Sequence, residues 1–100
     1  MALHLLPVLA ALRRPARDDV FAIATYYDGI DPALADSIVD QIEGAAAPLL
    51  ANPKIGRVVA QAGVRKWTVR HTPFLLLYTV RGNEIEIRRV RHGAADWLAE

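Results

Sequence analysis

Apolar positions along the chain change their spacing once, from helical to strand-like. Over residues 15–28, apolar side chains recur every three or four positions and form one stripe, which predicts an amphipathic helix. Residues 32 to about 50 carry a second stripe of the same kind, formed by Leu34, Ile38, Ile42, Ala45 and Leu49. The link between the two stripes is so short that the two helices must form an antiparallel hairpin.

Strand spacing governs residues 65–92. Residues 66–70 alternate between apolar and polar side chains, whereas residues 74–80 are apolar on both faces, which is typical of a central strand. Gly82 and Asn83 form the centre of a tight hairpin turn that leads into a last strand over residues 84–92. The alternation breaks at residues 88–90, where we expect a β-bulge or a bend.

The segments on either side of the helical hairpin complete the predicted fold. Residues 6–13 are apolar and compatible with a first strand, although a frayed helical lead-in is an alternative. Residues 52–57 contain Pro53 and Gly56 and therefore predict a loop. The sequence thus predicts an α+β fold of order β-α-α-β-β-β, in which an N-terminal helical hairpin packs on a mainly antiparallel four-stranded sheet. One hundred residues make a single domain, residues 1–100, with no room for a second core.

Composition excludes several kinds of site. The chain has no cysteine, which removes disulfides, thiolate metal ligands and thiol nucleophiles. Its three histidines are scattered, and the sequence contains neither a glycine-rich phosphate loop nor a serine flanked like a hydrolase nucleophile. We therefore expect neither a metal nor a cofactor. The apolar segment 1–12 lacks the preceding positive charge of a signal peptide, and no apolar run approaches the roughly 18 residues of a membrane span, so we expect a cytoplasmic protein.

Charge is distributed unevenly although the formal net charge is only +1. Acidic residues outnumber basic ones in the helical half, and basic residues outnumber acidic ones in the sheet half. A basic sheet suggests an anionic partner, either nucleic acid or an acidic protein segment. The alternative is that the arginines are only solvated strand positions. The candidates for a shared anion-binding surface are Arg65, Arg70, Arg88, Arg89 and Arg91, whereas Arg81, beside the hairpin turn, is expected to be a solvated position.

Four segments together resemble the RelE/ParE superfamily of bacterial type II toxins. They are RPARDDV at the start of the first predicted helix, NPKIGR at residues 52–57, FLLLY at residues 74–78 and RVRHGAADW at residues 89–97. The last run is the most specific, and the resemblance covers nearly the whole chain. It implies toxicity to the bacterial cell, neutralisation by a cognate antitoxin with an acidic C-terminal tail, and contact with DNA only through that antitoxin.

The superfamily divides by target, and the sequence is more similar to the ParE branch, the plasmid stabilisation proteins. Ribonuclease members place an arginine in the central strand where this chain has Leu75. Of the paired lysines on the preceding strand, Lys66 remains and Thr68 replaces its partner. The ParE branch acts by binding DNA gyrase and carries out no chemistry. We therefore expect a gyrase inhibitor rather than an enzyme.

The resemblance assigns roles to individual residues. We expect the acidic antitoxin tail to contact Arg65, Arg70, Arg89, Arg91, Phe21 and Leu50. Target recognition is expected at the C-terminal end of the domain, from His92, Asp96 and Trp97. One alternative is a ribosome-dependent mRNA endoribonuclease that uses Lys66, Arg70 and His92 as catalytic residues. A second alternative is a non-toxic antitoxin-binding module.

Overall fold

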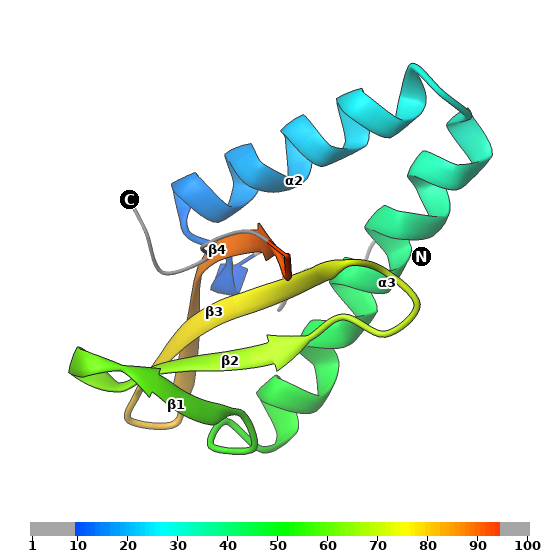
Figure 1. Ribbon diagram of the computed structural model, residues 1–100. Coiled ribbons are helices and arrows are strands. Elements are labelled where there is room, and N and C mark those ends of the chain that lie inside the picture. Colours follow the sequence, from blue (N-terminus) through cyan, green and yellow to red (C-terminus); the bar gives the residue numbers. More distant parts are fainter. Residues whose placement is uncertain (1–9, 95–100) are drawn as a thin grey trace.

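The computed structural model describes residues 10–94, and within them two helices precede a four-stranded antiparallel sheet (Figure 1). The helices are α2, Arg14–Asp28, and α3, Pro32–Ala51. The strands are β1, Arg57–Ala60; β2, Val64–Thr68; β3, Phe74–Arg81; and β4, Glu84–His92, and a short 3-10 turn, η1, Gln61–Gly63, joins the first two. The strands lie in the order β1-β2-β3-β4. The predicted fold class, a helical hairpin on an antiparallel sheet, is confirmed.

Local signals define the helix ends. A proline lies in the first turn of each helix, where the missing N–H costs no hydrogen bond. The carboxylate of Asp31 caps α3 by accepting a hydrogen bond from the backbone N–H of Ala33 at 3.0 Å. Pro48 lies inside the last turn of α3, which continues to Ala51. No helix among the described residues is long and apolar enough to cross a membrane.

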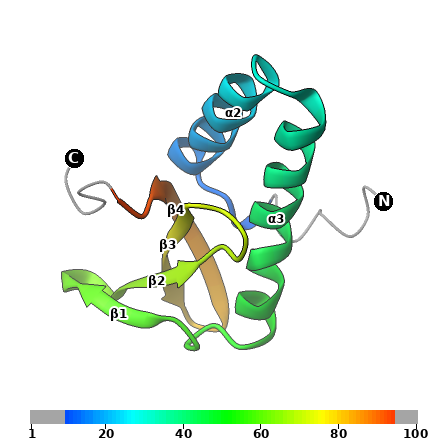
Figure 2. The same ribbon diagram turned by 45° about the vertical axis from the view of Figure 1, so that its right-hand side comes forward.

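The core lies between the helical hairpin and one face of the sheet. Alternate residues of β3 and β4 pack against the inward stripes of the helices: Phe74, Leu76, Tyr78, Ile85, Ile87 and Val90 meet Ala16, Ile38, Ile42, Ala46 and Leu49. Figure 2 shows both helices on this side of the sheet, with α2 beside β4. Leu34 was predicted to belong to the stripe of α3, but it is 41% exposed. It lies near the turn of the hairpin, which projects beyond the strands (Figure 1).

One strand of the predicted sheet is assigned differently. Residues 10 and 11 are helical, and Leu12 makes a single parallel bridge with Ile87 instead of a strand; residues 6–9 lie outside the described residues. The fourth strand is β1, which begins at the end of the predicted loop. Its four residues are too few to show an alternation of apolar and polar side chains. The turn that joins it to β2 contains Ala62 and Gly63, both with positive φ.

The predicted bulge and hairpin turn are confirmed. Leu77 pairs with Arg89 whereas Tyr78 pairs with Ile87, so Arg88 is the extra residue of β4. Because the bulge precedes them, Arg89 and Arg91 lie in regular register opposite Leu77 and Leu75. The turn between β3 and β4 contains Gly82 with φ of +64°, as a tight hairpin requires.

Candidate functional site

The face of the sheet opposite the helices, called the open face below, has an apolar centre with cations on both sides. Leu75 and Leu77 of β3 are not part of the core under the helices, yet they are only 4% and 5% exposed. By register, Lys66 and Thr68 of β2 lie on one side of them, and Arg89 and Arg91 of β4 lie on the other. Burial of β3 on both faces was predicted from its sequence and is confirmed.

Arg89 binds a carboxylate within the chain. Its Nε donates to Oδ2 of Asp19 at 2.7 Å, and a terminal nitrogen donates to Oδ1 at 2.9 Å. The backbone N–H of Val90 donates to the same Oδ2 at 2.9 Å. This planar fork joins α2 to β4, and it is the bidentate geometry in which arginine binds carboxylates most strongly. An antitoxin carboxylate at Arg89 would therefore compete with Asp19 or add to it.

Arg65 holds a loop on the other side of the sheet. Its guanidinium donates to the carbonyl oxygens of Lys54, at 3.1 Å, and Gly56, at 2.6 Å. Arg65 pairs with Tyr78, a core residue, so it lies on the helix-facing side and does not share the open face with Arg89 and Arg91. The sequence placed these arginines in one set, but strand alternation divides them.

Tyr78 holds the same loop, residues 52–57, by two hydrogen bonds. Its hydroxyl accepts a hydrogen bond from the N–H of Gly56 at 2.8 Å and donates to the carbonyl of Pro53 at 2.8 Å. Burial raises the pKa of Tyr78, which keeps the hydroxyl protonated as a donor. A Cβ on Gly56 would lie 2.5 Å from this hydroxyl, so only glycine fits. The loop segment that carries the family resemblance is therefore a packed structural unit.

The other predicted antitoxin contacts are accessible to different degrees. Arg70 is exposed in the turn between β2 and β3, and Arg91 is half-buried on the open face. Phe21 is 74% exposed on α2, which is unusual for a large apolar side chain, and Leu50 is 38% exposed near the end of α3. These four residues come from four separate elements. They are surface positions that a long, extended partner could contact, rather than one compact site.

The structure does not bring the alternative ribonuclease residues together. His92 pairs with Phe74, a core residue, and the two rings meet edge to face at 5.7 Å between centroids. Lys66 pairs with Leu77 on the open face, so Lys66 and His92 lie on opposite sides of the sheet. The Nδ1 atom of His92 accepts a hydrogen bond from the N–H of Ala94 at 3.1 Å. Of the predicted target-binding residues, His92 is exposed, and Asp96 and Trp97 lie outside the described residues.

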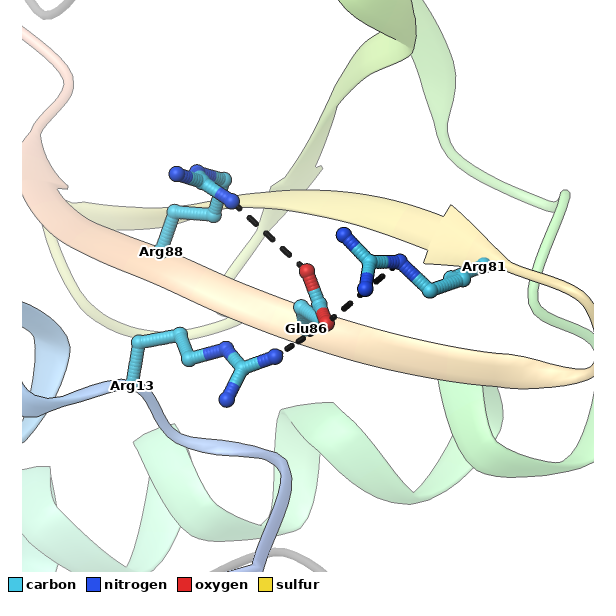
Figure 3. A network of polar contacts seen from close by, with 4 residues as sticks. All are labelled: Arg13, Arg81, Glu86 and Arg88. Carbon is cyan, nitrogen blue, oxygen red and sulfur yellow. Dashed lines mark hydrogen bonds and ion pairs between the residues drawn. The ribbon is translucent and has the colours of Figure 1, made fainter.

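Sequence reasoning noted Arg81 and Arg88 among the basic residues, but it missed the charged cluster that they form with Arg13 and Glu86 on the open face. Glu86 of β4 is nearly buried and lies among Arg13, Arg81 and Arg88, which come from three separate segments (Figure 3). A hydrogen bond from Arg13 is the main cause that holds the pKa of Glu86 below its usual range. Arg13 is 73 positions away in the chain, so no local pattern could pair it with Glu86. Among the described residues, no group of acidic or histidine side chains could hold a metal ion.

The comparisons with known proteins give the family. A family model described as the ParE toxin of the type II toxin–antitoxin system parDE matches residues 11–97. The chain belongs to the ParE toxin family. This match spans both helices and all four strands, and it includes the loop held by Arg65 and Tyr78.

A solved structure supports the same assignment. A chain titled "Chromosomal ParDE TA system from P. aeruginosa" is 33% identical in sequence and superimposes with a TM-score of 0.72. The match covers 81% of this chain and 90% of that one. A search of curated proteins finds no match. The fold is thus shared over about four fifths of this chain and nine tenths of that one.

Proposed function

We propose that this ParE-family chain arrests bacterial growth by binding DNA gyrase in the cytoplasm, and that a cognate antitoxin with an acidic tail neutralises it. The observation that carries the proposal is the family match over residues 11–97. The structural match to a chain of a ParDE system supports the presence of an antitoxin partner. Inhibition then follows from a protein–protein complex and needs no reaction at the surface of the toxin.

The chemistry of the open face supports binding rather than catalysis. A ribonuclease needs a general base, a general acid and charge stabilisation within reach of one phosphate. Lys66 and His92 lie on opposite sides of the sheet, and Leu75 is a buried apolar residue at the centre of the open face. The cations are instead spread along strands and turns, an arrangement that suits an extended acidic segment.

The proposed antitoxin contacts divide into two groups by their position on the surface. Arg70 and Arg91 are the direct contacts, because Arg70 is exposed in its turn and Arg91 lies beside the apolar centre of the open face. Arg65 and Arg89 support the surface from within, through the loop carbonyls and Asp19 respectively. Phe21 and Leu50 offer apolar anchors on the helices, where the tail would bury exposed hydrophobic area.

A titration of purified gyrase tests the proposal. Supercoiling of relaxed plasmid should fall as the chain is added, and linear plasmid should accumulate after detergent and protease treatment. Both effects should disappear when the cognate antitoxin is present in equimolar amount, and heat-unfolded chain serves as the control. If supercoiling and cleavage stay unchanged at high excess of folded chain, gyrase is not the target.

Two further arms separate the alternatives. Translating ribosomes are incubated with the chain, and the mRNA is examined for cuts in the ribosomal A site. Intact mRNA excludes the endoribonuclease, whereas cuts that are lost in Arg70→Ala would replace the gyrase proposal. Induced expression without growth arrest would instead indicate the non-toxic antitoxin-binding module.

A further inference from the structure

A shallow cavity lies on the open face at the hairpin end of β3 and β4. Its volume is about 480 Å³, within the range of sites for small molecules. Its walls combine apolar side chains, one hydroxyl and three charged groups: Ala62, Val64, Thr79, Val80, Arg81 and Arg88, with Glu86. None of these residues belongs to the set that the proposed function uses.

The charges in the cavity are not balanced. The hydrogen bond from Arg13 satisfies Glu86, while Arg81 and Arg88 approach its two oxygens only to 3.9 Å and 3.6 Å. Those distances are too long for hydrogen bonds. Within the described residues, Arg81 and Arg88 make no other polar contact, so both guanidiniums keep their N–H donors (Figure 3). Arg13, Arg81 and Arg88 surround the carboxylate of Glu86, and Glu84 pairs with Arg81 across the hairpin, which leaves an excess of one positive charge.

The backbone beside the cavity is strained. Ala62, which lines it, has φ of +62°, a left-handed conformation that residues with a Cβ rarely adopt. The tight turn between β1 and β2 requires this conformation, because Ala62 and Gly63 both have positive φ. Here the strained turn brings Ala62 and Val64 against the same cavity that Arg81 and Arg88 line.

From this arrangement we infer that the cavity between Arg81 and Arg88 binds a phosphate monoester, as carried by a nucleoside 5′-monophosphate or by a 5′-phosphorylated end of a nucleic acid. A monoester carries nearly two negative charges and three acceptor oxygens at neutral pH, so it can serve both guanidiniums at once. Its oxygens can bridge two guanidiniums through bidentate hydrogen bonds. A carboxylate or a phosphodiester carries one charge and offers only two charged oxygens, so we expect either to bind the two guanidiniums less strongly.

The lining explains how the rest of such a ligand fits. Thr79 offers a hydroxyl, and Ala62 and Val64 offer apolar surface for a sugar or base. Ionised Glu86 orients Arg81 and Arg88 toward one point. The positive charge of Arg13 reduces the repulsion between Glu86 and the incoming anion. The inference does not depend on gyrase or the antitoxin, because it concerns the isolated chain.

The test is a titration of the isotopically labelled full chain, followed by the amide resonances of residues 62–64 and 79–88. Adenosine 5′-monophosphate and inorganic phosphate should both produce saturable shifts there, and adenosine should produce none. Arg88→Gln should weaken binding of the monophosphate at least about tenfold, the effect of losing one charge-assisted hydrogen bond. Arg81→Gln should act in the same direction, and its exposed side chain makes misfolding an unconvincing explanation.

Arg70→Gln is the matched control, because it removes the same charge from an exposed turn that does not line the cavity. A similar loss of affinity in this variant would show nonspecific attraction and overturn the inference. So would an absence of saturable shifts at millimolar ligand, or tighter binding of an oligoglutamate peptide than of the monophosphate. A 5′-phosphorylated oligonucleotide is compared with its unphosphorylated counterpart, to distinguish binding of a nucleic-acid end from binding of a free nucleotide. If the two oligonucleotides bind equally and the monophosphate does not bind, the inference is refuted.

Discussion

The fork between Asp19 and Arg89 connects the helical hairpin to the edge of the sheet, and removing Asp19 isolates its contribution. In Asp19→Ala, Arg89 loses two hydrogen bonds and the N–H of Val90 loses its acceptor. The side chains are 16% and 34% exposed, so the pair is neither a surface pair, worth about 0–1 kcal/mol, nor a fully buried one, whose disruption costs about 3–5 kcal/mol. We expect an intermediate loss of about 2–3 kcal/mol.

The assay is equilibrium unfolding in urea, followed by circular dichroism. For a domain of this size, the expected loss corresponds to a fall in Tm of roughly 10–20 °C. Asp18→Ala is the matched control, because it removes the same charge from the neighbouring exposed position of α2. Arg89→Ala should also destabilise the chain, and the double variant should cost less than the sum of the two single variants. If Asp19→Ala destabilises no more than Asp18→Ala, the fork does not hold the hairpin to the sheet.

Three other contacts have measurable consequences. Tyr78→Phe should lower the free energy of unfolding by about 2–3 kcal/mol in urea, since Gly56 loses a buried acceptor, and a change below about 0.5 kcal/mol would contradict this. Gly56→Ala should destabilise the chain even when combined with Tyr78→Phe, because the carbonyl oxygen of Lys66 would still lie 2.8 Å from the new Cβ; rescue by that combination would show that the hydroxyl is the only obstacle. The pKa of Glu86 is lowered in the folded state, so ionised Glu86 stabilises the fold above the ordinary carboxyl pKa of 4.5, and this stabilisation is lost as the pH falls below that value. Glu86→Gln should therefore make the free energy of unfolding less dependent on pH on the acid side. An unchanged pH dependence there would refute this. Arg70→Ala should weaken antitoxin binding about tenfold while it leaves the unfolding free energy within about 0.5 kcal/mol, and calorimetry showing equal affinity would place the contact elsewhere.

Much of the fold is encoded in short-range patterns. The helix stripes, the proline and Asp31 signals at the helix starts, the doubly apolar β3 and the Gly82 turn each depend on residues close together in sequence, and the structure contains all of them. The bulge in β4 is also local, because an extra residue breaks the alternation where it occurs. These features could be predicted because local geometry alone determines them.

Other features depend on contacts that no local pattern contains. Strand β1 has only four residues, too few for a period, and Leu12 extends the sheet by a single bridge to Ile87. Leu34 fits the apolar stripe but is 41% exposed, and it lies in the first turn of α3, close to the link between the two helices.

The candidate site was predictable in composition but not in arrangement. Its arginines were found from charge alone, yet strand register places Arg65 and Arg89 on opposite sides of the sheet. Arg89 binds Asp19, which is 70 positions away in the chain, and Glu86 binds Arg13, which is 73 positions away. Such pairings arise only when the chain folds, so the sequence could identify a basic sheet but could not show which cations remain available to a partner.

The most direct measurement of the central claim is made in growing cells that carry a plasmid and an inducible copy of this chain. After induction, growth and the state of the plasmid are followed together, with and without co-expression of the antitoxin. The account predicts growth arrest with plasmid linearised in a protein-bound form, and recovery of both when the antitoxin is present. Uninterrupted growth, or arrest with intact plasmid and cut mRNA, would contradict it.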